Sequence, residues 1–463
     1  DYTNMKKFKK SYYNFIKEYN GNTVIYNTKT GSVSIISPES SNDFLSIIEN
    51  PNAENVNDKL FQQMLSEGYI VDEQFDELND IRELSNTSRS FSNVLRVTVL
   101  PTETCNFTCP YCFIYTMRNK HMTDETWKAL YKMFYNFCEK NKDSEVFFLN
   151  ILWYGGEPLI MADKIISFMQ KINKLLERYP NGRLHSSIVT NGYLLTYKIF
   201  QELCDANVRQ IQVTLDGDAE NHDKYRTLSN KRPTFHTIYS NLLEIKDKVA
   251  KDEKFSFAIR CNFLKSSIPS ARRLIELFSK DFLSDGRFNL YFRPVYDFET
   301  DRNSDDINES DYFGITAGSE MQNQLLLETN QDIKQVAGIS NPLPEPIPSW
   351  CESVAEHAFI IGYDGSIYIC DTMITDTDKA VGYLKMDGTI ELNSKADCWR
   401  KTIFERDGEN DSDASKECMV CKMLPICMGG CVRSRMDSGK NTCFWDEDLI
   451  YKAMDDYAKV YGE

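Results

Sequence analysis

The most constraining feature of this sequence is an alternation of strand-like and helix-like segments between Leu95 and about Pro294. Short apolar segments predict strands at Leu95–Leu100, Val146–Trp153, Leu184–Thr190, Gln210–Leu215, Phe255–Asn262 and Phe288–Phe292. Amphipathic segments predict intervening helices, among them Asp124–Glu139, Met161–Leu176, Tyr197–Ala206 and Ile268–Ser279. This alternation predicts an α/β fold with a parallel sheet, here a partial (β/α)6 barrel of the TIM type. Functional side chains in such barrels gather at the carboxyl ends of the strands.

Length and charge exclude several classes of protein. With 463 residues the chain is too long for one ordinary hydrophobic core, so two or three domains are expected. The formal net charge of -16 argues against non-specific nucleic-acid binding, which needs clustered Lys and Arg. We find no apolar run of about 18 residues that would span a membrane, and no apolar signal segment at the N-terminus. We therefore predict a cytoplasmic protein with a small or peptide substrate and no nucleic-acid or membrane partner.

The first 85 residues predict a separate winged-helix-like domain. Strands are expected at Ser11–Glu18, Thr23–Asn27 and Ser32–Ile36, with a hairpin turn between the last two. A helix from Pro38 to Ile48 follows. A second helix, capped by Asn55 or Asn57, ends near Glu67, and Gly68–Val71 closes the domain. The polar stretch Glu83–Asn93 predicts a linker, which we place at residues 86–94.

The remaining boundaries follow from composition. The barrel is expected at residues 95–300, and a connector with one helix near Gly314–Glu328 is expected at residues 301–349. A cysteine-rich domain is expected at residues 350–463. In a reducing compartment, the fourteen cysteines of the chain are better explained as metal ligands and single thiols than as a disulfide framework.

Three cysteines, Cys105, Cys109 and Cys112, follow the first predicted barrel strand at CxxxCxxC spacing. A four-iron cluster has four iron corners, so three thiolates leave one iron available to another ligand. A structural zinc site normally closes with four ligands in two separated pairs. The triad therefore favours a cluster that takes part in chemistry, with a zinc site or buried thiols as the alternatives.

This triad, with the aromatic Tyr111 before its last cysteine, resembles the signature of the radical S-adenosylmethionine (SAM) enzymes. The resemblance implies that SAM chelates the open iron through its amino and carboxylate groups. It also implies that a reduced cluster cleaves SAM to methionine and a 5′-deoxyadenosyl radical, for which a low-potential electron donor such as flavodoxin or ferredoxin is needed.

Further motifs at predicted strand ends fit the same family. Gly155, Gly156 and Glu157 resemble its GGE motif, in which the carboxylate accepts hydrogen bonds from the SAM ammonium. Thr190 and Asn191 resemble its ribose-contacting turn. Asp216 belongs to a run, beginning at Thr214, that is frequent in peptide- and protein-modifying members, and by that resemblance Arg226 would pair with the SAM carboxylate. Ordinary turns and an exposed arginine without a role are the alternatives, and Arg260 and Asn262 fit family usage without an assigned contact.

A second cysteine array fills the C-terminal domain and resembles the SPASM domain, which binds two further four-iron clusters. By that pattern an outer cluster would be held by Cys418, Cys421, Cys427 and Cys443. An inner cluster would be held by Cys351, Cys370 and Cys431. A zinc ribbon at Cys418–Cys431 is the alternative.

The seven thiolates of this array are one short of eight. An inner cluster with an open iron could bind a substrate thiolate, as in thioether-forming peptide maturases, whereas Cys398 could instead close the site. Asp371 follows Cys370 directly, as in anaerobic sulfatase maturases, where that carboxylate is a general base. It could also merely orient a loop.

The N-terminal domain resembles the PqqD-like element that binds the leader of ribosomally made precursor peptides by strand addition. We therefore predict a radical SAM oxidoreductase with three [4Fe-4S] clusters. It would install thioether crosslinks in a precursor peptide whose leader binds to residues 1–85. The alternatives are a formylglycine-forming sulfatase maturase, a peptide maturase that forms C–C crosslinks or epimerises, and a zinc-stabilised peptide-binding protein without catalysis.

Overall fold

The computed structural model describes residues 6–53, 57–112, 114, 119–296, 307–331, 343–374, 376–405 and 412–462. The chain forms two compact units, which we name by their content. The terminal unit comprises residues 1–90, 338–354 and 401–463, and the barrel unit comprises residues 91–337 and 355–400. Residues 350–463, expected as one cysteine-rich domain, are therefore divided between the two units.

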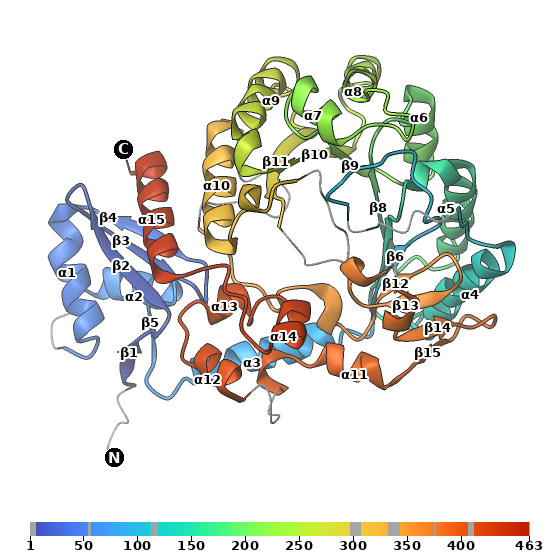
Figure 1. The fold of residues 1–463 in the computed structure, drawn as a ribbon. Helices are drawn as coiled ribbons and strands as arrows, with labels where there is room; N and C mark the ends of the chain where they lie inside the picture. Colours follow the sequence, from blue (N-terminus) through green and yellow to red (C-terminus); the bar gives the residue numbers. More distant parts are fainter. Residues whose placement is uncertain are drawn as a thin grey trace. The chain divides into compact units, whose positions relative to one another are not determined.

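The barrel unit contains six parallel strands in sequence order, as predicted (Figure 1). They are β6 (Val94–Val99), β7 (Phe147–Trp153), β8 (Gly182–Thr190), β9 (Gln210–Thr214), β10 (Ser256–Phe263) and β11 (Phe288–Pro294). Helices surround them: α4 (Asp124–Lys140), α5 (Ala162–Leu176), α6 (Tyr197–Asp205), α7 (Ala219–Tyr225), α8 (Phe235–Lys248), α9 (Ile268–Asp281) and α10 (Ile315–Glu328). The partial (β/α)6 barrel is thus confirmed, and α10 is the helix expected within the connector.

Alternation along each strand determines which side chains face the barrel interior. In β10 every second residue is buried, among them Ile259 and Cys261, and these residues pack under the outer helices. Arg260 and Asn262 lie between them and face the opposite side, which is the interior. The same alternation recurs in β6 and β7. The apolar residues therefore hold the helices, while polar residues line the interior.

The barrel sheet continues beyond its first strand, β6. β12 (Ala358–Ile361) pairs in parallel with β6, and β13 (Ser366–Tyr368), β14 (Gly382–Leu384) and β15 (Ile390–Leu392) add antiparallel strands. Helix α11 (Ser394–Arg400) follows. The first part of the cysteine-rich segment is consequently an extension of the barrel sheet, which the sequence did not indicate.

The terminal unit joins the two ends of the chain. Its three-stranded sheet contains β2 (Asn14–Tyr19), β3 (Asn22–Asn27) and β4 (Val33–Ile36), and β1 (Phe8–Lys10) pairs with β5 (Ile70–Asp72). Its helices are α1 (Pro38–Glu49), α2 (Asp58–Ser66), α3 (Glu77–Arg89), α12 (Ser412–Met419), α13 (Leu424–Cys427), α14 (Val432–Ser438) and α15 (Glu447–Tyr461). Asn57 caps α2 through a hydrogen bond from Leu60 N, and the other candidate, Asn55, lies outside the described residues.

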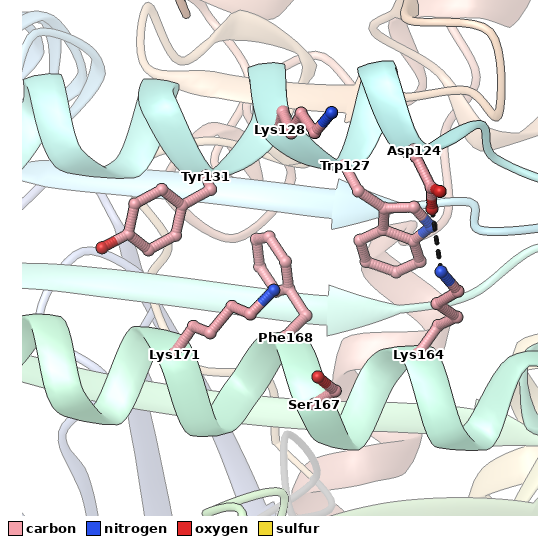
Figure 2. A pocket seen from close by; sticks show the side chains of 8 residues that line it. All are labelled: Asp124, Trp127, Lys128, Tyr131, Lys164, Ser167, Phe168 and Lys171. Carbon is pink, nitrogen blue, oxygen red and sulfur yellow. Dashed lines mark hydrogen bonds and ion pairs between the residues drawn. The ribbon is translucent and has the colours of Figure 1, made fainter.

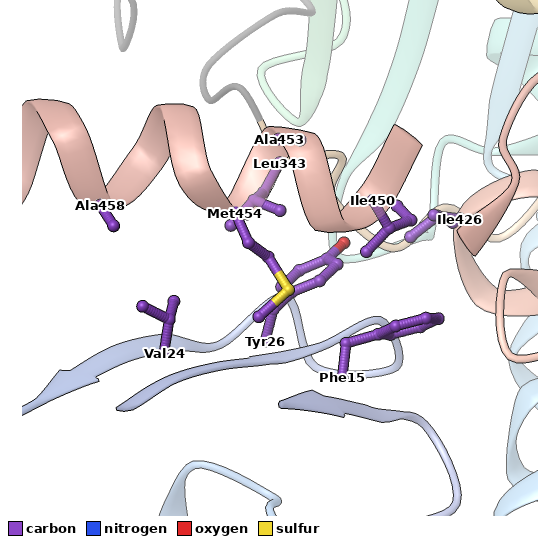
Figure 3. Close-up of a cluster of buried hydrophobic side chains, with 9 residues drawn as sticks. All are labelled: Phe15, Val24, Tyr26, Leu343, Ile426, Ile450, Ala453, Met454 and Ala458. Atoms are coloured by element: carbon purple, nitrogen blue, oxygen red, sulfur yellow. The ribbon is translucent and has the colours of Figure 1, made fainter. Parts of the chain in front are cut away.

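One face of the three-stranded sheet packs against α15 (Figure 3). Phe15, Val24 and Tyr26 of the sheet bury their side chains against Ile450 and Met454 of the helix. Removing this apolar area from water is the main source of stability for such a contact. The N-terminal strands are therefore part of a core that includes the end of the chain.

Two expectations for the N-terminal region are wrong. The strand expected at Ser11–Glu18 begins only at Asn14, because the backbone turns before it and the buried Glu77 side chain accepts hydrogen bonds from Ser11 Oγ and Tyr12 N. The linker expected at Glu83–Asn93 is largely helix α3, which Asp76 caps through a hydrogen bond from Asn79 N. The helix was not predicted because most of its residues are polar and its buried face, which includes Ile81 and Ser85, is narrow.

No helix in the described parts of the chain combines the length and the apolar composition needed to cross a bilayer.

Candidate functional site

The loop after β6 carries the cysteine triad. Cys109 is buried, and Cys112 N donates a hydrogen bond to Cys109 O at 3.2 Å. Cys105 Sγ accepts a hydrogen bond from Phe107 N at 3.4 Å. Burial raises the pKa of Cys105 to about 12, and the neighbouring Glu157, Cys109 and Cys112 raise it further. The three thiols are therefore close enough to interact electrostatically.

The two glycines after β7 allow the next turn to approach the cysteine loop. A Cβ on Gly155, whose φ is +117°, would lie 2.6 Å from the carbonyl oxygen of Thr102. A Cβ on Gly156 would lie 2.3 Å from the carbonyl oxygen of Thr104. Hydrogen bonds from Gly156 N to Thr102 O and from Glu157 N to Thr104 O join the two segments. The close approach expected at these glycines is thus made to the backbone that carries the triad.

Glu157 connects the ends of β7 and β8. Its buried carboxylate accepts hydrogen bonds from Thr190 Oγ1 at 2.6 Å, Asn191 N at 2.7 Å and Leu159 N at 3.0 Å. Burial raises the pKa of Glu157, and these hydrogen bonds oppose the increase. Asn191 also reaches the cysteine loop, because its side-chain amide donates to Asn106 Oδ1 at 2.7 Å. The structure brings Glu157, Thr190 and Asn191 together, and their contacts with SAM stay predictions.

A second buried network lies at the carboxyl end of β9. Tyr111 donates a hydrogen bond to Asp216 Oδ2, and Arg226 Nη1 donates to the Tyr111 hydroxyl at 2.9 Å. Arg226 Nη1 also lies 3.9 Å from Asp216 Oδ2. Asn262 donates through its backbone and side-chain nitrogens to Asp216 Oδ1. Burial raises the pKa of Asp216, and the charge of Arg226 opposes that increase.

Arg226 provides a test of whether these residues fit the expected cofactor. Its side chain is 8% exposed, and among the described residues its Nε has no hydrogen-bond partner. A buried donor without a partner is costly unless a ligand satisfies it. Although burial opposes it, the charges of Cys109, Tyr111 and Asp216 raise the pKa of Arg226. A permanently cationic donor beside the triad fits the carboxylate of SAM, and three thiols are the donor set that iron–sulfur clusters require.

Polar side chains of β10 and β11 line the barrel interior. Arg260 Nε donates to Asn262 Oδ1 at 2.7 Å, and the Tyr291 hydroxyl donates to Gln212 Oε1 at 2.6 Å. Arg293 Nη1 donates to Gln322 Oε1 at 3.1 Å. The sequence analysis missed Tyr291 and Arg293, although strand alternation in β11 was the signal that could have found them.

Asp371 and Cys370 follow β13 in the barrel unit. Cys370 Sγ lies 3.9 Å from Asp371 Oδ1. Burial raises the pKa of Tyr154, and the charges of Asp371 and Cys112 raise it further. Tyr154 also packs with Cys112 in one apolar cluster. The predicted base Asp371 and the triad residue Cys112 therefore both lie near Tyr154, which the sequence analysis did not select.

Four of the C-terminal cysteines lie together in the terminal unit. Burial raises the pKa of Cys418 to about 12, and Cys427, Cys421 and Cys443 add to the increase. Burial also raises the pKa of Cys427 to about 11, with contributions from Cys443 and Cys421. The structure thus brings together the four thiols predicted to hold the outer cluster.

The cysteines predicted to hold the inner cluster are divided. Cys351 and Cys431 belong to the terminal unit, whereas Cys370 and Cys398 belong to the barrel unit. This cluster and its closure by Cys398 therefore stay predictions. Across the described residues, no three or more His, Cys, Asp or Glu side chains are gathered around one point where a single metal ion could bind. A four-iron cluster differs because each of its thiolates binds a different iron.

Comparison with known proteins identifies part of the barrel unit. Residues 99–257 match the model of the radical SAM superfamily. A cysteine-type anaerobic sulfatase-maturating enzyme of Clostridium novyi is 25% identical over 354 residues, which are 72% of this chain and 86% of the relative. A serine-type anaerobic sulfatase-maturating enzyme of Bacteroides thetaiotaomicron is 31% identical over 170 residues, which are 34% of this chain and 38% of the relative.

A solved structure, native anSMEcpe with bound AdoMet, shares the fold with a TM-score of 0.55 and 20% identity. The match covers 79% of this chain and 97% of that chain. Residues 99–257 therefore carry a radical SAM domain, for which SAM and one [4Fe-4S] cluster are the implied cofactors. The other two clusters, the SPASM and PqqD-like assignments and thioether formation stay predictions.

Proposed function

We propose that this chain is a radical SAM enzyme that oxidises a peptide substrate. The observation that carries this proposal is the position of the triad beside the buried group of Tyr111, Asp216 and Arg226, where Arg226 Nε has no hydrogen-bond partner among the described residues. Three thiols next to a buried cation match the needs of a cluster whose open iron binds the amino and carboxylate groups of SAM.

SAM and the cluster, once bound, supply a 5′-deoxyadenosyl radical that removes hydrogen from a substrate carbon. The residues of the chain hold and shield this chemistry. Cys105, Cys109 and Cys112 bind the cluster, and Arg226 binds the SAM carboxylate. Glu157 fixes the turn at Thr190 and Asn191 through its hydrogen bonds. These polar groups are buried, so water does not compete for their hydrogen bonds and their positions are maintained.

A peptide substrate is favoured by the relatives, which are named as sulfatase-maturating enzymes and therefore act on a protein side chain. In this chain Arg260, Tyr291 and Arg293 present polar groups to the barrel interior, where a peptide backbone would lie. Backbone carbonyls and acidic side chains accept hydrogen bonds from such donors. A peptide segment entering the barrel would thus find hydrogen-bond partners close to the predicted SAM site.

For the reaction itself we propose thioether formation. It replaces one C–H bond and one S–H bond of the peptide by a C–S bond, so the peptide is oxidised by two electrons and loses two hydrogens. One hydrogen atom would go to the 5′-deoxyadenosyl radical, the thiol proton to solvent, and the second electron to an auxiliary iron–sulfur cluster. The argument is the count of C-terminal cysteines, which leaves an inner cluster one thiolate short and able to bind a substrate sulfur. We propose with it that residues 1–85 act as a PqqD-like module, which would bind the leader of a precursor peptide.

Formylglycine formation on a sulfatase-type peptide is the second candidate. The 25% identity with the Clostridium novyi enzyme and the neighbouring pair of Cys370 and Asp371 favour it. In that reaction a cysteine or serine side chain of the peptide becomes an aldehyde. The two candidates differ in product and not in the radical chemistry.

The shared proposal is tested by anaerobic reconstitution. We expect about twelve irons per chain and formation of 5′-deoxyadenosine from SAM. Alanine at Cys105, Cys109 and Cys112 should remove about four irons and abolish cleavage, while the unfolding temperature changes little. Persistent 5′-deoxyadenosine formation by the triple variant contradicts the proposal, as does a protein that binds zinc and no iron.

Mass spectrometry of the peptide separates the two candidates. Neighbouring reading frames that encode a short cysteine-containing peptide supply one substrate, and a sulfatase-derived peptide supplies the other. Loss of two hydrogens per crosslink, with one cysteine protected from alkylation, supports thioether formation. Exchange of the cysteine sulfur for an aldehyde oxygen supports sulfatase maturation instead.

A further inference from the structure

A groove runs between the outer helices α4 and α5 of the barrel unit, with a volume of about 470 Å³ (Figure 2). Its floor contains the rings of Trp127, Tyr131 and Phe168. The other lining residues are polar or charged, and they are Asp124, Lys128, Lys164, Ser167 and Lys171. The groove takes no part in the site described above.

The groove is basic on a strongly acidic chain. Three lysines and one carboxylate, that of Asp124, line the groove, whereas the whole chain carries a formal charge of -16. Lys164 donates a hydrogen bond to Asp124 at 2.8 Å. Lys128 and Lys171 are exposed, and neither forms an ion pair within the residues that the structure describes. Two lysines therefore stay available to an anionic partner.

The aromatic floor is continuous with the turn that supports the cysteine loop. Trp127 packs against Trp153 and Phe168 with ring-centroid distances of 5.8 Å and 5.2 Å. Trp153 is fully buried at the end of β7, and the next residue, Tyr154, packs with Cys112. Packed rings and one backbone step, from Trp153 to Tyr154, thus connect the groove with the predicted cluster.

We propose that this groove is the docking site of an acidic, one-electron carrier protein that reduces the cluster held by the triad. The inference rests on the proposed function, because SAM cleavage needs one electron from outside the enzyme. In this step the carrier loses one electron and the four-iron cluster gains it, and no covalent bond changes. Lys128 and Lys171 would pair with carboxylates of the carrier, and the partly exposed ring of Tyr131 would add an apolar contact between them.

The distribution of the lysines favours an acidic protein over a small anion. Lys128 lies on α4, and Lys164 and Lys171 lie about two turns apart on α5. A single phosphate needs several donors that converge on one point, whereas an acidic protein surface matches charges spread along a rim. The partly exposed ring of Tyr131 adds apolar area that an inorganic anion cannot use.

The test compares two reductants and measures binding directly. We would prepare the double variant Lys128→Glu/Lys171→Glu and a control, Lys132→Glu/Lys174→Glu, which makes the same charge change on exposed residues of the same helices outside the groove. Calorimetry at low and high salt would measure the affinity of each holoenzyme for flavodoxin. Formation of 5′-deoxyadenosine without peptide would be driven either by flavodoxin, its reductase and NADPH or by dithionite.

The groove variant should bind flavodoxin about tenfold more weakly than the wild type at low salt, and flavodoxin-driven cleavage should fall in proportion. Dithionite-driven cleavage should be unchanged, and the control should resemble the wild type. Equal loss with both reductants, or unchanged flavodoxin affinity and rate, rejects the docking site. The latter result is expected if the groove instead binds a small anion or an acidic segment of the substrate. A wild-type enzyme that fails with dithionite rejects the proposed function itself.

Discussion

Arg226 is the residue whose surroundings say most about cofactor binding, because it is buried, charged and incompletely hydrogen-bonded within the described chain. The variant Arg226→Met should weaken SAM binding roughly 30-fold or more, since losing one partner of a buried, hydrogen-bonded charge pair costs at least about 2 kcal/mol. Titration of the reconstituted enzyme with SAM would measure this change. Unchanged affinity would remove the assignment.

Two further variants separate charge from general damage. Arg226→Lys keeps the charge but loses the planar guanidinium, so we expect an affinity between those of the wild type and Arg226→Met. Arg273 pairs with Asp218 at the surface of the same unit, and its side chain is 49% exposed. Arg273→Met should leave SAM affinity unchanged, because exposed ion pairs contribute little.

Asp371 differs in role from the cofactor-binding residues. If it is a general base toward the peptide, Asp371→Asn should reduce product formation about 100-fold while SAM cleavage continues. Comparing peptide product with 5′-deoxyadenosine in one reaction measures both quantities. Asp378→Asn, at an exposed position of the same segment, is the control. An equal fall of both products would assign Asp371 a structural role near Tyr154 instead.

Among the elements, the turn after β7 determines where the cysteine loop lies. Gly156→Ala would place a Cβ 2.3 Å from the carbonyl oxygen of Thr104, a backbone atom that cannot move without displacing the loop. We expect about four fewer irons per chain after reconstitution, with the helical content retained. Iron analysis and circular dichroism would check this.

Gly314 supplies the matched control for this change, because a Cβ there would meet no atom within 4 Å. Gly314→Ala should keep the wild-type iron content. If Gly156→Ala also keeps it, the turn does not support the cysteine loop in the way that the contacts indicate.

At the scale of the whole molecule, the two ends of the chain share one core. Met454→Ala should reduce the free energy of unfolding by about 2–5 kcal/mol, because Met454 is fully buried between α15 and the N-terminal sheet. Hydrogen exchange should then accelerate in β2–β4 and in α15 together. Val460, 51% exposed on the same helix, offers Val460→Ala as a control with a change within about 0.5 kcal/mol.

Acceleration confined to α15 would show that the sheet is stable without the helix. The shared core also affects how leader binding can be tested. Deleting residues 1–85 would expose the apolar face of α15, so reduced peptide affinity after that deletion would not distinguish lost recognition from lost structure. Single substitutions on the sheet are the more informative choice.

The sequence by itself determined the barrel and the identity of its chemical groups. Apolar alternation predicted all six strands of the barrel, because burial under helices imposes a local pattern that can be recognised without knowing the fold. The triad at Cys105, Cys109 and Cys112 was recognisable for a similar reason, since its spacing is a property of a few adjacent residues. The grouping of the four outer cysteines rests on the same kind of local spacing and stays a prediction.

Only the tertiary structure decided which distant segments meet. Three contacts join residues that are far apart in sequence. Strand β12 pairs with β6, helix α15 covers the N-terminal sheet, and Glu157 accepts a hydrogen bond from Thr190. Helix α3 was also decided by the tertiary structure. Its few buried residues form a buried face only because they contact residues far away in sequence, Tyr13 and Met428. Such contacts depend on long-range packing and desolvation, which local composition does not encode.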